Sequence, residues 1–211
     1  MVNRILFWLQ FLLLIGGVGI IVFTFAPLAS QEISYQMRQI GSREVVVADV
    51  SAESDKAQTP PAQPWEYRKT IIYPKSLDFS LVIPKIGVNS LVFANIDSAN
   101  PEAYLPILKK GVAHAAGSRL PNQRGVVFLF SHSTDAFYNV GRYNAAFFLL
   151  NKLESKDTVY LFYKNRRYRY QVTDKQVIPP EEVPQFVENL SGNRLVLQTC
   201  WPPGKIGRAH V

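Results

Sequence analysis

The sequence predicts a mostly β domain, a barrel or sandwich of about seven short strands with few helices, joined to one N-terminal transmembrane helix. Hydrophobic residues make up 47% of the 211 residues, enough to bury a sizeable core. Most apolar runs are short and are bounded by turn residues, which is typical of strands. The exception is a long uncharged run near the N-terminus, which favours a membrane span.

This uncharged run, residues 5–28, is long enough to cross a bilayer. A helix rising about 1.5 Å per residue would span roughly 36 Å here, against a hydrocarbon core of about 30 Å. Arg4 and the amino terminus precede the run and favour a cytoplasmic N-terminus. We therefore expect residues 1–30 to be a membrane anchor in contact with lipid, in a single-pass protein whose domain is extracytoplasmic. The sequence "PLAS" at 27–30 leaves a cleaved signal peptide as the alternative.

Residues 31–76 are expected to form an extracytoplasmic stalk or linker. Within them, residues 51–64 are polar and rich in Pro, Ala and Ser, so they cannot bury enough apolar area to offset the entropy of ordering. The run "REVVVADV" at 43–50 is either a short strand or an apolar surface patch, and its residues do not decide between the two.

The domain is expected to begin near residue 77. Residues 79–93 indicate two short strands broken at Pro84. Residues 99–111 indicate a short helix that Asn100 caps and Gly111 ends. The other expected elements are a buried strand at 125–130, one or two helical turns or else a strand at 145–153, a hairpin of 158–164 with 167–178, and a buried strand at 193–199.

Charge and cysteine content exclude several classes of function. The net charge is +7, but the basic residues are scattered and no nucleic-acid-binding module is recognisable, so we expect no nucleic-acid partner. A single cysteine excludes an internal disulfide and a zinc site built from several cysteines. We also expect no cofactor, and the absence of a dense acidic cluster gives no argument for calcium.

Two reactive side chains stand at the ends of predicted buried strands. His132 follows the run "GVVFLF", and Cys200 follows "RLVLQT". A thiolate nucleophile beside an imidazole that titrates near neutrality can perform acyl transfer at amide bonds. From the residues alone, a buried inert thiol with a surface histidine stays an equal alternative. A metal site of His114, His132 and Cys200 is disfavoured because its spacing matches no compact zinc pattern.

The sequence also resembles the sortase family. "LQTC" (197–200) followed by Trp-Pro-Pro resembles the sortase signature in which Leu-x-Thr-Cys ends a strand. "LVIPKIGVNSLV" (81–92) is similar to the family's opening strands, and residues 103–133 are similar to the segment that leads to its catalytic histidine. The resemblance runs in order from about residue 78 to residue 204, behind the N-terminal anchor that sortases typically carry.

The resemblance implies a sortase-like β-barrel of seven or eight strands over residues 77–204 and a membrane-anchored cysteine transpeptidase. Cys200 would be the nucleophile and His132 the general acid/base, while His114 would have a packing or loop-support role. The substrates would be secreted proteins with a C-terminal sorting signal, and the acceptor an amine of cell-wall precursor or pilin. The alternatives are a membrane-tethered β-barrel binding domain with an inert cysteine and a sortase-like hydrolase that transfers to water.

The sequence departs from the family pattern at two places. Ser131 and Ser133 flank the histidine where the family often has Gly and Arg, and any role of Asp135 stays open. The family also carries an arginine on its last strand, about nine positions after the cysteine; Arg208 stands eight after it and is a doubtful equivalent. "KIGRAHV" can be back-translated into the start of a common sequencing adapter. We therefore expect residues 205–211 to be a non-native tail, the last strand to be missing, and this fragment to have little activity.

Overall fold

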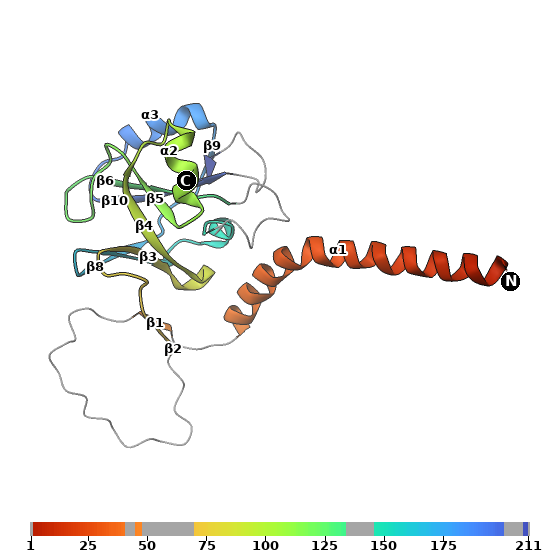
Figure 1. Cartoon of the computed structure of the whole chain (residues 1–211). Coiled ribbons are helices and arrows are strands. Elements are labelled where there is room, and N and C mark those ends of the chain that lie inside the picture. Colours follow the sequence, from red (N-terminus) through yellow and green to blue (C-terminus); the bar gives the residue numbers. More distant parts are fainter. Residues whose placement is uncertain (1, 41–44, 48–69, 134–145, 201–208, 211) are drawn as a thin grey trace, which may run out of the picture.

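A curled sheet forms the body of the molecule in the computed structural model (Figure 1), which describes residues 2–40, 45–47, 70–133, 146–200 and 209–210. The strands are β1 (Val45–Val47), β2 (Thr70–Ile72), β3 (Phe79–Ile83), β4 (Val88–Ile96), β5 (Val112–Ala115), β6 (Val126–Phe130), β7 (Thr158–Tyr163), β8 (Arg166–Gln171), β9 (Val177–Ile178), β10 (Arg194–Cys200) and β11 (Ala209–His210). The helices are α1 (Val2–Ile40), α2 (Pro101–Leu108) and α3 (Val183–Glu188), with short 3-10 turns η1 (Pro84–Ile86), η3 (Leu150–Lys152) and η4 (Pro180–Glu182).

The main sheet runs in the order β8-β7-β3-β4-β5-β6-β10-β11-β9, and β1 with β2 forms a separate parallel ribbon. Most neighbouring strands are antiparallel. Two pairs are parallel, β4 with β5 and β6 with β10. A parallel pair needs a crossover connection, which α2 supplies between β4 and β5. The connection from β6 to β10 is far longer and includes the β7–β8 hairpin.

The core follows the alternation of side chains along each strand. Odd-numbered residues of β3, β6 and β7 point into the curl, where Leu81, Leu129 and Leu161 are fully buried. The outer face is covered in two places, one of which is the contact of Val47 in β1 with Val82 and Phe162. Beside β6 and β10, Phe128 and Val196 pack with Val183 of α3. Apolar side chains therefore line both faces of the strands that lead to Cys200.

The helix α1 is longer than the anchor expected from the sequence. Residues Phe7–Ala26 within it are apolar enough to cross a membrane, with a mean hydropathy of 2.3 over the span and no burial inside the protein. The helix continues to Ile40, so its last turns occupy part of the segment expected to be a linker. The linker interpretation stays a prediction for residues 48–69, which lie outside the described residues.

The predicted fold class is confirmed: a mostly β, curled sheet with short helices and one apolar N-terminal helix. The break at Pro84 is the turn η1 between β3 and β4. The Asn100 side chain caps α2 by accepting a hydrogen bond from the Glu102 amide at 3.0 Å. Of the run 145–153, the described residues 146–153 form turns and η3 rather than a strand, which agrees with one of the two alternatives.

Other elements differ from the prediction. The hairpin turns at Lys164 and Asn165, which both have positive φ as a tight two-residue turn requires. Its second strand ends at Gln171 rather than at residue 178, and residues 177–178 form the separate strand β9. The short strand β5 and the helix α3 were not predicted. The undecided run at 43–50 does contain a strand, β1.

The end of the chain forms slightly more structure than expected. Ala209 and His210 make the two-residue strand β11, which pairs antiparallel with Thr199 and Cys200 of β10. This pairing involves only two residues of each strand, and the expectation that the last barrel strand is missing stays a prediction. The origin of residues 205–211 stays a prediction, and residues 201–208, including Arg208, lie outside the described residues.

Candidate active site

The candidate site lies where β6 and β10 end together. These strands are parallel, and their register pairs Val126 with Arg194 and continues without a shift to Phe130 with Gln198. Parallel neighbours end at the same edge of a sheet, so residues that follow β6 come close to the last residues of β10. Both reactive side chains singled out in the sequence belong to this edge.

Two hydrogen bonds extend the pairing beyond the end of β6. The Ser131 amide donates to the Gln198 carbonyl at 3.1 Å, and the buried Thr199 hydroxyl donates to the Ser131 carbonyl at 3.1 Å. If the register is continued by one more residue, His132 falls opposite Cys200. The amide of Phe147, a fully buried core residue, donates to the His132 carbonyl at 3.3 Å and fixes the chain there.

Cys200 is the last residue of β10 and is half-buried. By alternation, its side chain shares a face of the strand with Val196, the outer face that α3 covers. Burial raises the pKa of the Cys200 thiol, because a low-polarity environment disfavours the thiolate. A nucleophilic thiolate at this position therefore needs a nearby positive charge, which a protonated imidazole would supply.

The serines on either side of His132 are buried polar groups. Ser131 and Ser133 are 4% and 1% exposed, and neither hydroxyl has a hydrogen-bond partner within the described structure. The backbone beside the half-buried histidine is held instead by the hydrogen bonds of the Ser131 amide and carbonyl. Asp135, whose role was left open, lies outside the described residues.

His114 is not part of this edge. It is the third residue of β5, is 2% exposed, and packs near Phe79. Its Nδ1 accepts a hydrogen bond from the Asn95 amide at 3.2 Å, and its Nε2 lies 3.0 Å from the Arg119 carbonyl. Burial lowers the pKa of His114, and the Arg119 carbonyl opposes this in part. These contacts are compatible with a packing or loop-support role for His114, which stays a prediction.

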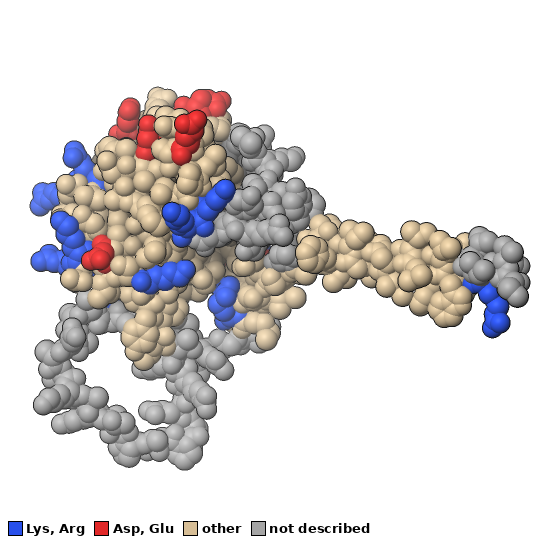
Figure 2. Space-filling view, viewed as in Figure 1, with Lys and Arg blue, Asp and Glu red and all other residues tan. Residues whose placement is uncertain are grey.

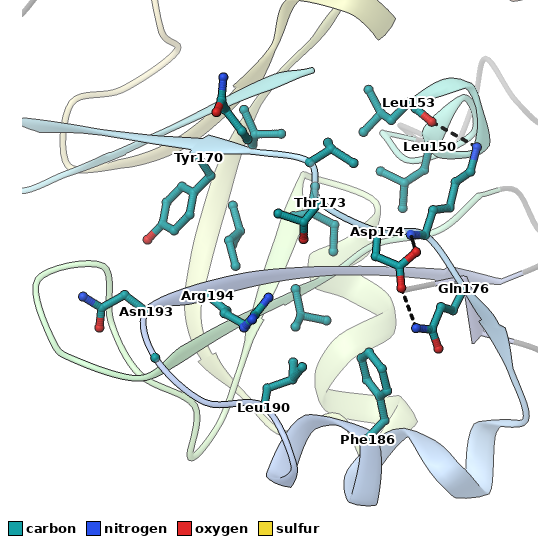
Figure 3. A pocket seen from close by; sticks show the side chains of 18 of the residues that line it. Leu150, Leu153, Tyr170, Thr173, Asp174, Gln176, Phe186, Leu190, Asn193 and Arg194 are labelled. Atoms are coloured by element: carbon teal, nitrogen blue, oxygen red, sulfur yellow. Dashed lines mark hydrogen bonds between the residues drawn. The ribbon is translucent and has the colours of Figure 1, made fainter. Parts of the chain in front are cut away.

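A cavity of about 610 Å³ lies next to the site but does not contain it. It opens between β8 and β10, and Figure 3 shows Leu150 and Leu153 on one side of it. Phe186 of α3 and Leu190, which follows α3, lie on another side. The described residues that line it on β10 are Arg194–Leu197. Cys200 is three residues further along the strand, about 10 Å away at 3.3 Å per residue. The cavity therefore lies between β8 and β10 inside the curled sheet, and not at the edge where β6 and β10 end.

Charged side chains are unevenly distributed over the surface. In the face shown in Figure 2, acidic side chains gather at the end of the domain where α2 and α3 lie, while lysines and arginines are spread over the rest. The basic groups on this face form no continuous stripe. Among the described residues, no group of three His, Cys, Asp or Glu side chains is placed to hold a metal ion.

Comparisons with known proteins agree on one family. The model of the sortase domain matches residues 81–210. Among curated proteins, the chain is similar to sortase D of Bacillus subtilis (strain 168), with 23% identity over 129 residues. That match covers 61% of this chain and 57% of the relative, so the chain spans less than two thirds of the length of this relative.

Solved structures with a similar fold include sortase C-1 from Actinomyces oris, at 26% identity and a TM-score of 0.51, covering 63% of this chain and 68% of that chain. Sortase A from Corynebacterium diphtheriae also has a TM-score of 0.51, at 21% identity, covering 65% of this chain and 59% of that chain. At 21% identity, the similarity to sortase A supports the fold alone. Both agree with the curled sheet described above.

Proposed function

Because the chain belongs to the sortase family, we propose that it is a cysteine transpeptidase in which Cys200 is the nucleophile and His132 the general acid/base. The observation that supports this most directly is the register of β6 and β10, which brings residues 68 positions apart to one edge of the sheet. The expected substrate is a secreted protein with a C-terminal sorting signal. The expected acceptor is an amine of a cell-wall precursor or a pilin.

The proposed reaction has two steps. In the first, the Cys200 thiolate attacks the carbonyl carbon of the scissile amide, a C–S bond forms, the C–N bond breaks, and the His132 imidazolium gives its proton to the leaving amine. In the second, the acceptor amine attacks the thioester, neutral His132 takes the proton from that amine, and the C–S bond breaks to restore the thiolate. The product is a new amide bond, and the two steps balance without an oxidant.

The position of the thiol explains why the pair is needed. Burial raises the pKa of Cys200, so an isolated thiol here would be mostly protonated at neutral pH. Proton transfer to His132 would give a thiolate–imidazolium pair that the rigid strand ends hold in place. No residue is assigned to the oxyanion, because Arg208 lies outside the described residues.

For the membrane topology, we infer a cytoplasmic N-terminus with the domain on the outer side. The Phe7–Ala26 span supports an anchor, and Arg4 precedes it. A transpeptidase that acts on secreted proteins also has to face the compartment that they enter. Labelling of an exposed lysine by a membrane-impermeant reagent on intact cells tests this topology.

The test of the proposed chemistry is acyl-enzyme formation. The full chain in detergent or vesicles is incubated with a library of sorting-motif peptides, and intact-mass spectrometry looks for a thioester on Cys200. Because residues 205–211 are expected to lower the activity of this chain, we expect the adduct to form slowly in the unmodified chain and at a similar rate in His114→Gln. It should not form in Cys200→Ala and should form far more slowly still in His132→Ala. Product analysis with and without an added amine separates transfer from hydrolysis. A chain that forms no adduct although its thiol is accessible to iodoacetamide would contradict the proposal.

A further inference from the structure

The last turns of α1 contact the domain through a small set of polar and aromatic groups. The Glu32 carboxylate and the Lys152 ammonium form an ion pair at 3.1 Å. The same ammonium lies 5.4 Å from the centre of the Tyr35 ring, and Tyr35 packs against the main core cluster. Hydrogen bonds from Gln36 and Lys152 lower the pKa of Glu32, so this carboxylate is ionised at neutral pH.

A second contact lies six positions after Glu32, less than two turns further along the helix. The Arg38 guanidinium donates to the Ile86 carbonyl at 3.4 Å and covers Gly87. A Cβ atom at Gly87 would lie 2.6 Å from the Arg38 Cζ atom, and Gly87 has a φ of 68°. Because glycine has no Cβ atom, Gly87 permits both the positive φ of the turn and the close approach of the Arg38 side chain.

The chain then reaches the domain again through β1. Val47 is 2% exposed and packs against Val82 and Phe162 on the outer face of the main sheet. The Arg167 guanidinium donates to the Val47 carbonyl at 3.0 Å, and β1 pairs with β2 in parallel. Residues 31–40 and 45–47, which we call the docked segment, therefore hold the domain at two separate surfaces.

Each polar contact in the docked segment is weak by itself. Partly exposed ion pairs contribute about 0.2–1 kcal/mol and exposed cation–π contacts about 0.5–1 kcal/mol. They act together, however, because the contacting residues lie on one short stretch of chain, so that one contact, once formed, brings the others close to their partners. The burial of Val47 and the packing of Tyr35 add apolar area to the same attachment.

The docked segment lies close to both the membrane and the candidate site. Glu32 is six positions after Ala26, the end of the span, which is about 9 Å along a helix. On the domain side, Lys152 belongs to η3, the short cyan turn that Figure 1 shows between the sheet and the bent end of α1. Phe147, five residues earlier, donates its amide hydrogen bond to the His132 carbonyl.

We propose that the docked segment attaches the domain to its own membrane anchor non-covalently and holds it in one orientation, with the candidate site on the side of the domain that carries η3. The covalent connection through residues 48–69 is then not required to keep the domain at the membrane. The value of this orientation for catalysis rests on the proposed function, whereas the attachment itself does not.

The test uses the full chain with a site-specific protease sequence in place of residues 55–61, in vesicles of zwitterionic phosphatidylcholine. After complete cleavage, the vesicles are pelleted and the domain is measured in the pellet and in the supernatant. We expect most of the cleaved domain to stay in the pellet. The double variant Lys152→Glu with Arg38→Glu should release it at least several-fold more. Lys110→Glu combined with Lys156→Glu makes the same change of charge away from the docked segment and should retain the domain.

A charge swap makes the test specific to the pair. Glu32→Lys or Lys152→Glu alone should increase release, and the two together should restore part of the retention. If cleavage releases the domain of the unmodified chain as completely as that of the double variant, the proposal is wrong.

A cross-linking experiment checks the contact without any substitution. A zero-length carbodiimide should join Glu32 to Lys152, with Lys85 and Glu154, whose charged atoms are 2.7 Å apart, as the internal positive control. Detection of the control cross-link without the Glu32–Lys152 product would overturn the docking. Neither readout uses catalysis, so a failed docking and a failed transpeptidase proposal are distinguishable.

Discussion

The two histidines on neighbouring strands, His114 in β5 and His132 just after β6, differ in almost every physical respect. The His114 ring is 2% exposed and both of its nitrogens have hydrogen-bond partners. His132 is half-buried and lies where the strand has already ended. The same side chain is therefore a structural group at one position and a candidate proton carrier at the other.

The hydrogen bonds of His114 explain the difference. The Asn95 amide can only donate, so Nδ1 must be the unprotonated nitrogen, and Nε2–H then donates to the Arg119 carbonyl. Protonation of Nδ1 would break the first contact and would place a charge in the core. A histidine that the fold holds in one protonation state cannot carry protons during turnover, whereas a histidine at an open strand end can.

The largest expected effect is on catalysis at the strand end. Cys200→Ala should abolish acyl transfer, a loss of at least about a thousandfold, and His132→Ala should reduce it by about a hundred- to ten-thousandfold. His114→Gln should keep most of its activity per folded molecule. The measurement is the rate of peptide cleavage together with the thermal unfolding midpoint of each variant. Equal losses in His114→Gln and His132→Ala would remove the distinction between the two histidines.

The second effect is on stability, and it should have the opposite ranking. His114→Gln loses the ring and the geometry of two buried hydrogen bonds, so we expect a loss of about 2 kcal/mol in the free energy of unfolding. For a domain of this size, that lowers the midpoint by roughly 8 °C. His132→Ala should shift it far less. Differential scanning calorimetry of the two variants checks the ranking, and a His132→Ala midpoint as low as that of His114→Gln would contradict it.

A third, smaller effect concerns the hydroxyl that joins the two strand ends. Thr199→Val keeps the shape of the side chain but removes the hydrogen bond to the Ser131 carbonyl. We expect a loss of about 1 kcal/mol of stability and up to about a tenfold loss of activity, because His132 is the next residue along. Thr158→Val at the start of β7 provides a matched control away from the site. Unchanged turnover in Thr199→Val would show that this bond does not position His132.

The smallest effect is the pH dependence that His114 contributes. Burial lowers its pKa below the ordinary value of 6.5, so between the two values the unfolded state binds the proton and the folded state does not. The contribution of His114 to the free energy of unfolding is therefore complete above about pH 6.5. It declines as the pH falls below this value, by at most about 1.4 kcal/mol per pH unit. Urea unfolding of the parent and His114→Gln between pH 7.5 and 5 measures the difference. If the free energy of unfolding changes with pH equally in the two proteins, His114 is not the source of this pH dependence.

Local sequence patterns predicted much of the fold because they encode local geometry. Pro84 broke a strand where the sequence indicated, and Asn100 capped its helix. β5 was missed because "VAHA" has only four residues and two alanines, and α3 because prolines interrupt its region. The pairing of the strands could not be predicted. The register of β6 against β10 joins residues far apart in the chain, and no local sequence pattern encodes it.

The candidate site followed a similar division. Cys200 and His132 were found because each follows an apolar run and because their motifs resemble one family. The hydrogen bond from Thr199 to the Ser131 carbonyl was not predicted. Strand alternation places Thr199 on the core side, and a buried hydroxyl needs a hydrogen-bond partner, so the sequence did hold a signal for such a contact. The docking of α1 carried no local signal, because Glu32, Tyr35 and Arg38 resemble any polar turn that follows a membrane span.

The parallel pairing of β6 with β10 also has a consequence for the folding pathway. Its two halves are 68 residues apart, and the β7–β8 hairpin between them can form from local contacts much sooner. Closing so long a loop makes this pairing a late and slow event. The thiol and the imidazole therefore meet only when the rest of the sheet is in place. In a refolding experiment, reactivity should appear after the bulk of the secondary structure, so that a nascent or partly unfolded chain carries a cysteine without its partner.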